Sequence, residues 1–365
     1  MDSRSRFCFP NSECLILAFS LFISLEIQSQ PLRVGVAGLK HDHVLGLMSQ
    51  YQSGKVILLG IAESDRDLVR RYQQRFHLPD SLFYSSVASM LGHIHPDAVL
   101  AYNPIAEHLD VVEACAPRGI SVMVEKPLAT TVAQAERMAT LAHQFHIQVL
   151  TNYETTWYPS NQAIFRKLHE AESLGEIRKM IVHMGHQGPK EIGCSPDFLA
   201  WLTDPVKNGG GAIMDFGCYG ANLMTWLMDG RAPVAVRAVT HQIKKNIYPN
   251  VDDDATILLE YPAATGIVEA SWNWPFGIKD LEVFCQKGYL HALNGSTLLE
   301  RDSGSYYPVT TDPLKYPDNL SYLSAVLRGE WHDDHDPSSL ENNLIVVRIL
   351  QAARQSAKEG RRISL

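Results

Sequence analysis

The residues best placed for chemistry are Glu125, Lys126 and Pro127, which end the apolar run Val122–Val124. A short continuous apolar run is typical of a buried parallel strand. Ligands of open α/β sheets bind at the carboxyl ends of such strands, and a proline cannot continue the hydrogen-bonded ladder. The spacing therefore predicts that Lys126 contacts a ligand or moves a proton, although ordinary surface charges at a strand end would give the same residues.

A second candidate site is the turn after the first predicted strand, which reads Gly35-Val-Ala-Gly38-Leu39-Lys40-His41-Asp42-His43. In the dinucleotide fingerprint G-x-G-x-x-G, glycines allow a tight turn and a close approach of pyrophosphate to the backbone. Only the first glycine is kept, as Gly38, but Lys40 and His41 at a helix N-terminus are suited to contact phosphate. The predicted cofactor contacts here are Gly35, Gly38, Leu39, Lys40 and His41. His41 and His43 also have the spacing of metal ligands, but no third ligand lies nearby in the sequence, so no metal site is predicted.

Further residues extend the predicted dinucleotide site. Glu63 closes the second predicted strand, where an acid accepts hydrogen bonds from the ribose hydroxyls and repels a 2′-phosphate. Its position favours NAD over NADP. Asn103 and Pro104 follow the third predicted strand and His108 opens the next helix, so all three are predicted cofactor contacts, although turn and cap roles would explain Asn103 and His108 equally well. Glu125 and Lys126 complete the predicted cofactor contacts.

A third motif runs from the glycine turn Gly209–Gly211 into a predicted helix. Asp215, Tyr219 and Asn222 are spaced i, i+4 and i+7 and are therefore expected to share one helical face. A lysine and a tyrosine facing one cleft are suited to oxidise a hydroxyl group; a buried tyrosine with a satisfied hydroxyl is the alternative. The predicted catalytic residues are Lys126, Tyr219 and Asp215. The predicted substrate contacts are His186, Asn222 and Trp157.

These residues need two kinds of domain to position them. The first part alternates predicted strands (32–37, 56–62, 97–101, 120–124 and 148–151) with helices (44–52, 67–76, 86–91, 107–117 and 131–145). This order indicates right-handed βαβ units and a parallel sheet. After residue 152 come longer alternating strands (177–184, 234–241, 255–260, 265–272, 281–285 and 289–293) and helices (162–171, 221–228 and 340–358). The predicted fold is an α/β domain over 31–152, followed over 153–365 by an α+β domain with a large open, mainly antiparallel sheet.

Composition and the first thirty residues limit the cellular setting. The chain has 365 residues, is 45% hydrophobic and carries a net charge of −8 with no basic patch, which argues against a nucleic-acid partner. Residues 1–30 carry Arg4 and Arg6 before an apolar run at 15–25, which is typical of a secretory signal peptide. An uncleaved anchor or a misassigned start codon is the alternative. Export without stable membrane insertion after processing is therefore expected.

The remaining cysteines (Cys115, Cys194, Cys218 and Cys285) lack metal-site spacing and are predicted to be free thiols.

Together these motifs resemble the Gfo/Idh/MocA oxidoreductases over residues 32–365. The resemblance rests on the first turn, Glu63, Asn103-Pro104, Glu125-Lys126-Pro127, the segment Gly209–Tyr219, the strand Gly266–Trp272 and the final helix. It implies a Rossmann domain, a second domain built on an open sheet, and a nicotinamide between them.

The same resemblance implies roles for individual residues. Lys126 would contact the reacting hydroxyl and the cofactor ribose, with Asp215 and Tyr219 at the substrate. Tyr219 resembles the branch of glucose–fructose oxidoreductase, xylose dehydrogenase and dihydrodiol dehydrogenase. The chain departs from the family in its glycine motif and in the segment Asn152–Pro159, where Glu154, Thr155 and Thr156 replace basic residues.

The predicted protein is an exported, homo-oligomeric oxidoreductase with tightly bound NAD. It would transfer hydride between nicotinamide and a hydroxyl of a sugar, sugar derivative or glycoside. One alternative is redox-neutral, NAD-dependent glycoside cleavage through a 3-keto intermediate. Another is a non-catalytic, cofactor-bound sensor or binding protein. The sequence specifies neither the substrate nor the carbon oxidised.

Overall fold

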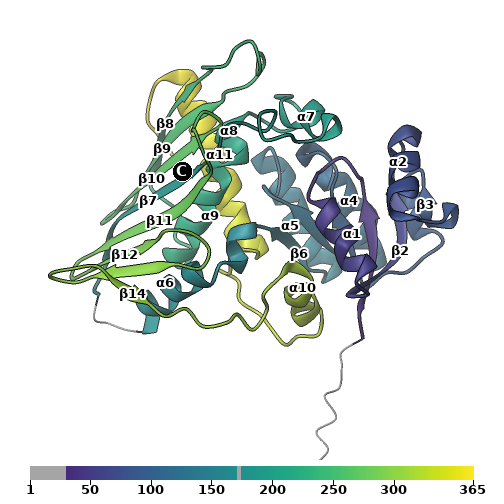
Figure 1. The fold of residues 1–365 in the computed structure, drawn as a ribbon, viewed down its shortest axis with the longest axis horizontal. Helices are drawn as coiled ribbons and strands as arrows, with labels where there is room; N and C mark the ends of the chain where they lie inside the picture. The colour runs from purple at the N-terminus through teal and green to yellow at the C-terminus, as the bar shows by residue number, and fades with distance from the viewer. Residues whose placement is uncertain (1–29, 171–173) are drawn as a thin grey trace, which may run out of the picture. The chain divides into compact units, whose positions relative to one another are not determined.

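The computed structural model describes residues 30–170 and 174–365, and two β-sheets organise this part of the chain (Figure 1). The signal peptide predicted for residues 1–30 lies, apart from Gln30, outside the described residues. Residues 31–365 form one compact unit. Within residues 30–170 and 174–365, no helix is both long enough and apolar enough to cross a membrane.

The first sheet has six strands in the spatial order β3-β2-β1-β4-β5-β6, and every neighbouring pair is parallel. The strands are β1 Leu32–Ala37, β2 Val56–Ala62, β3 Phe83–Tyr84, β4 Ala98–Ala101, β5 Ser121–Glu125 and β6 Val149–Asn152. The helices between them are α1 Val44–Gln52, α2 Arg66–Phe76, α3 Val87–Leu91, α4 His108–Cys115 and α5 Val132–Phe145. Every residue of β4 and β5 is buried, as expected for a parallel sheet covered on both faces. The predicted α/β domain is confirmed.

The second sheet has nine strands in the order β14-β13-β12-β11-β7-β10-β9-β8-β15. Its strands are β7 Ile177–Gly185, β8 Ala235–His241, β9 Asp254–Glu260, β10 Thr265–Ser271, β11 Ile278–Cys285, β12 Tyr289–Ala292, β13 Leu298–Arg301, β14 Tyr307–Val309 and β15 Ile363–Ser364. The pair β7–β10 is parallel and the other pairs are antiparallel. The helices α6 Pro159–Glu170, α9 Gly217–Leu227 and α11 Leu340–Glu359 cover one face of this sheet (Figure 1). The predicted open, mainly antiparallel sheet is also confirmed.

The end of the chain returns to the first sheet. Leu320 and Leu323 of α10 (Asn319–Leu327) pack into the apolar core beside β1. Leu340 and Val347 of α11 pack into the core beside β5, while the same helix contacts α9 and β8. The region predicted as the second domain thus supplies part of the first domain's core.

Helix α7 (Pro196–Leu202), near the site, was not predicted from the sequence, whereas helix α8 (Ala212–Asp215) begins the helical segment that was predicted after the glycine turn. Helix α7 begins with Ser195 as N-cap and Pro196 in the first turn, which is a recognisable start signal. It covers the turn after β1, where the Trp201 indole donates a hydrogen bond to the Lys40 carbonyl over 3.1 Å.

Candidate functional site

A buried ion pair at the carboxyl end of β5 joins the first domain to helix α8. The Lys126 Nζ donates to Asp215 Oδ1 over 2.5 Å and to the Asp215 carbonyl over 3.1 Å. Both side chains are less than one-tenth exposed. The strand ends at Glu125 and Pro127 follows Lys126, so the backbone turns here and directs the lysine to α8 of the other domain. The contact brings together two of the three residues predicted to be catalytic, and their catalytic role stays a prediction.

Asp215 is held from its other side by Trp272. The indole Nε1 of Trp272 donates to Asp215 Oδ2 over 2.9 Å, so both carboxylate oxygens have a partner. Burial alone would raise the pKa of the Asp215 carboxyl, but the charge and hydrogen bond of Lys126 hold that pKa below its ordinary value. Burial would lower the pKa of the Lys126 ammonium, yet Asp215 holds it above its ordinary value. The resting pair is therefore an ammonium and a carboxylate.

Tyr219 lies beside this pair. Its ring centroid is 5.1 Å from the Lys126 Nζ and 5.7 Å from the Lys279 Nζ of β11. The Tyr153 ring packs edge-on against it, with centroids 5.5 Å apart. Burial raises the pKa of the Tyr219 phenol well above its ordinary value, so the hydroxyl stays protonated at neutral pH. The site thus combines a neutral phenol with an ammonium.

The turn before α8 requires glycine because the backbone at Asp252 passes close to it. Gly209 has φ +84°, in the left-handed region. A Cβ on Gly211 would overlap the Asp252 carbonyl oxygen. The Asp252 carboxylate accepts hydrogen bonds from the Gly211 and Ile213 amides over 2.8 and 2.7 Å, which fixes the start of α8. This turn therefore sets the position of Asp215.

Replacing Gly211 by alanine is expected to lower the free energy of unfolding by about 1–3 kcal/mol or more, because the added methyl group must displace backbone. Gly277→Ala is the matched control, since a Cβ there meets no atom within 4 Å. Chemical denaturation of both variants measures the difference. Equal stability of the two would show that the turn relaxes freely.

The predicted dinucleotide site forms a pocket of about 300 Å³ whose lining includes Gly38, Lys40, Glu63 and Asn103. Gly38 has φ +80°, and a Cβ there would lie 2.9 Å from the Asn103 backbone. Within the described residues, Oδ1 of Asn103 is buried without a hydrogen-bond partner. Glu63 accepts hydrogen bonds from the Leu39 amide over 3.0 Å and the Asp65 amide over 2.8 Å. A carboxylate has about four acceptor positions, so Glu63 and the unpaired Asn103 oxygen fit the hydroxyls of a nucleotide ribose.

Other predicted cofactor residues have different surroundings. Gly35 lies inside β1, where an added Cβ would meet Met90 and Val99, so its role is packing. The buried ring of His108 has Nδ1 3.1 Å from the Leu128 carbonyl, and burial lowers the pKa of this imidazole to about 4. Its hydrogen bond supports the turn that follows Pro127. Pro104 caps the 3-10 turn Ile105–Glu107.

Of the predicted common face of Asp215, Tyr219 and Asn222, the first two both lie beside Lys126, but the placement of Asn222 with them is wrong. The helix breaks at Phe216, between α8 and α9, so the i, i+4, i+7 rule does not apply across it. Asn222 lies in the interior, where its Nδ2 donates to the Pro337 carbonyl over 2.7 Å. It ties α9 to the segment before α11.

The other two predicted substrate contacts remain near the site. The His186 ring packs edge-on against Phe216 at 4.9 Å between centroids, and burial lowers the pKa of its imidazole. The Trp157 Nε1 donates to Asn152 Oδ1 over 3.4 Å. Trp157 also lines a pocket of about 500 Å³ together with His43, Asn152 and Glu154.

Sequence reasoning missed Lys279 and Trp272 as partners of the site. Lys279 forms an ion pair with Glu154, one of the residues that replace basic ones in the family segment after β6. The positive charge next to this segment is thus that of Lys279, which lies on β11. The unusual acid at Glu154 was a signal that a compensating base lies opposite, but nothing in the local sequence located that base.

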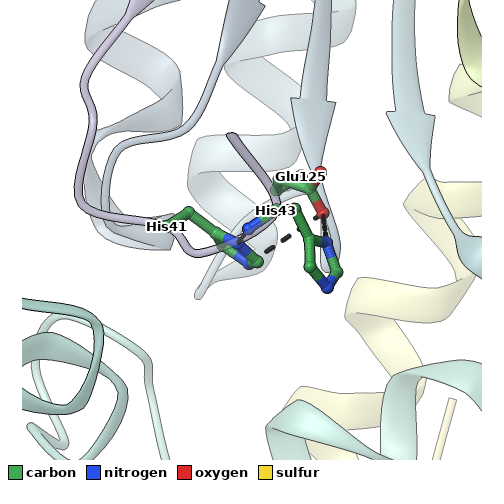
Figure 2. Close-up of side chains that lie close together, drawn as sticks. All are labelled: His41, His43 and Glu125. Atoms are coloured by element: carbon green, nitrogen blue, oxygen red, sulfur yellow. Dashed lines mark hydrogen bonds and ion pairs between the residues drawn. The ribbon is translucent and has the colours of Figure 1, made fainter. Parts of the chain in front are cut away.

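A histidine–carboxylate cluster is formed by His41, His43 and Glu125, the residue that precedes Lys126 (Figure 2). His43 Nδ1 is 3.0 Å from Glu125 Oε2, and the buried His41 Nε2 is 3.9 Å from the same oxygen. Burial holds the pKa of His41 well below its ordinary value. Burial alone would raise the pKa of Glu125, but the charge of His43 lowers it to about 2, so the carboxylate is ionised.

The chain belongs to the Gfo/Idh/MocA family of oxidoreductases. Residues 32–153 match its NAD-binding Rossmann-fold oxidoreductase domain, and residues 163–291 match its C-terminal domain. The predicted family membership is confirmed.

Individual relatives are distant. A trans-1,2-dihydrobenzene-1,2-diol dehydrogenase of Xenopus laevis is 25% identical over 208 residues, covering 56% of this chain and 57% of that enzyme. The chain thus spans little more than half the length of this relative. A myo-inositol 2-dehydrogenase of Thermotoga maritima is 23% identical and covers 92% of this chain and 98% of its own. Aldose-aldose oxidoreductase from Caulobacter crescentus has the same fold, with a TM-score of 0.76 and 21% identity over 92% of this chain and 100% of that one.

Proposed function

We propose that this protein is an NAD-dependent oxidoreductase that acts on a hydroxyl group of a sugar, sugar derivative or glycoside. The observation that carries the proposal is the buried Lys126–Asp215 pair beside the Tyr219 phenol, at the strand ends that also form the dinucleotide pocket. Bound NAD would supply the hydride acceptor. Tyr219 and Lys126 would exchange the hydroxyl proton, while Asp215 and Trp272 hold the ammonium in place. The names of the relatives, which include inositol and aldose enzymes, support the substrate class.

The experiment is a panel of aldoses, polyols and aryl glycosides, each incubated with the protein and NAD. Stoichiometric formation of reduced nicotinamide with oxidised sugar supports the proposal. Aglycone release without net NADH would favour redox-neutral cleavage instead. Binding of NAD with neither product would favour a sensor.

The protonation state of the site predicts opposite pH dependences for the two reaction directions. Lys126 and Tyr219 both have raised pKa values, so both stay protonated through neutral pH. Carbonyl reduction needs a proton donor and is expected to slow as the pH rises above neutral, whereas hydroxyl oxidation needs an acceptor and is expected to accelerate. Initial rates from pH 6 to 10 in both directions test this. Parallel profiles would assign the proton transfer to another group.

We infer that NAD is preferred over NADP because Glu63 faces the position of the 2′-phosphate. Glu63→Gln removes the charge and keeps an acceptor oxygen for one of the two loop amides, so the preference for NAD is expected to fall roughly 10-fold or more. Asp110→Asn is the control, because Asp110 lines the same pocket and loses the same charge. Titration of both cofactors measures the ratio. A wild-type preference for NADP would contradict this role of Glu63.

We also propose that the protein is exported with NAD tightly bound. Residues 1–30 have the pattern of a signal peptide, and free NAD is scarce outside the cytoplasm, so a loosely held cofactor would be lost. Cell fractionation with N-terminal sequencing tests export, and cofactor assay after dialysis tests retention. An unprocessed cytoplasmic chain that loses NAD readily would contradict both parts.

The second sheet supports a homo-oligomer. Its face opposite α6, α9 and α11 carries partly exposed apolar side chains, including Ile181, Leu258 and Ile267, with Val239 57% exposed. Pairing of this face between two copies would remove these side chains from water. Light scattering with a Val239→Lys variant tests the contact, and an unchanged mass for that variant would place the interface elsewhere.

A further inference from the structure

Three potential metal-ligating side chains converge from segments far apart in the sequence (Figure 2). His41 and His43 lie in the turn after β1, and Glu125 is the last residue of β5. One donor atom from each residue lies within 4.8 Å of the others. This third ligand could not be predicted from the sequence, because Glu125 lies 82 positions after His43.

His41 supplies an independent sign that something belongs between these residues. Its side chain is 1% exposed, and its Nδ1 accepts a hydrogen bond from the His43 amide over 3.2 Å. Its Nε2 points toward Glu125 and, within the described part of the chain, has no hydrogen-bond partner. Leaving such a buried nitrogen unpaired costs about 1–3 kcal/mol, which a ligand at this position would offset.

The donor set is that of a site for a borderline divalent ion. Two imidazoles and one carboxylate hold the catalytic zinc of several hydrolases and leave a coordination position open. Ligand atoms about 2.0–2.2 Å from a tetrahedral ion lie roughly 3.4 Å apart. The separations of 3.0 and 3.9 Å to Glu125 Oε2 are close to this value.

The surroundings suit such an ion. Asn152 Nδ2 donates to the second Glu125 oxygen over 2.9 Å and so orients the carboxylate, as outer-shell partners of metal ligands do. The nearby Lys126 ammonium is paired with Asp215, which reduces its repulsion of a cation. His43 also lines the pocket of about 500 Å³ shared with Asn152 and Glu154, through which an ion or a substrate oxygen can enter.

We propose that His41, His43 and Glu125 bind one divalent first-row ion of the Zn²⁺ type, with an open position toward this pocket. Binding through His41 Nε2 moves the ring proton to Nδ1 and breaks the bond from the His43 amide. The ion offers a Lewis acid for a hydroxyl or carbonyl oxygen. The proposal does not depend on the oxidoreductase function, because metal binding is measurable without a substrate.

The test is titration of the purified, chelator-treated full chain with Co²⁺, followed by displacement with Zn²⁺. The expected result is one Co²⁺ per chain with visible absorption bands that Zn²⁺ abolishes. His43→Gln and Glu125→Gln are each expected to weaken binding roughly 100-fold. His169→Gln is the matched control, because His169 also pairs with a carboxylate, Asp229, and within the described residues no third metal-ligating side chain joins that pair. It should bind like wild type.

Absence of stoichiometric binding in the wild type, or equal binding by His43→Gln, would overturn the proposal. His43 is partly exposed, so its variant decides the matter even if Glu125→Gln fails to fold. NADH binding is measured in the same samples. NADH binding without metal would refute this site alone, and metal binding without NADH would refute the oxidoreductase proposal alone.

Discussion

Replacing Lys126 by methionine is expected to lower turnover by roughly 10²-fold or more, the usual scale for loss of a group that transfers a proton. The variant also leaves Asp215 buried with only Trp272 as a side-chain partner, so its stability should fall as well. Activity is measured with the best sugar from the panel, and stability by chemical denaturation.

The double variant Lys126→Met/Asp215→Asn separates these two effects. It removes both charges, so it should recover much of the stability of the single variant without recovering turnover. Near-wild-type turnover in either folded protein would exclude Lys126 from the mechanism.

Replacing Asp215 alone by leucine is expected to destabilise the protein by about 3–5 kcal/mol, because it leaves the Lys126 ammonium buried and uncompensated. The Trp272 indole also loses its acceptor. Urea denaturation measures the loss, with Asp229→Asn as control because the Asp229 carboxylate is half exposed. A loss below about 1 kcal/mol would mean that Lys126 readily reaches water.

The parts of the fold that could be predicted are those with strong local patterns. The apolar run before Glu125 and the βα alternation located the first sheet, because buried parallel strands differ clearly from the helices between them. Helix α10 was missed although Asp318 and Ser321 form a capping box at its start. Its pattern is short, and its position depends on packing against the core beside β1.

The site was predictable where a motif fixes the backbone and not where the contact crosses the fold. Lys126 and Asp215 follow a strand end and a glycine turn, and they do meet. Asn222 was misplaced because the break at Phe216 leaves no clear sign in the sequence. Lys279 and the contact of His43 with Glu125 depend on tertiary geometry alone.

The most direct test of the central claim is a titration of the purified protein with NADH and with NADPH. Binding is monitored by energy transfer from tryptophan to the reduced nicotinamide. The claim is that a dinucleotide occupies the pocket of Glu63 and Asn103 and reaches Lys126. The account predicts saturable NADH binding at one site per chain and weaker NADPH binding. In the Glu63→Gln variant, the affinities for NADH and NADPH should lie closer together. Binding of neither nucleotide to a folded protein would contradict the account.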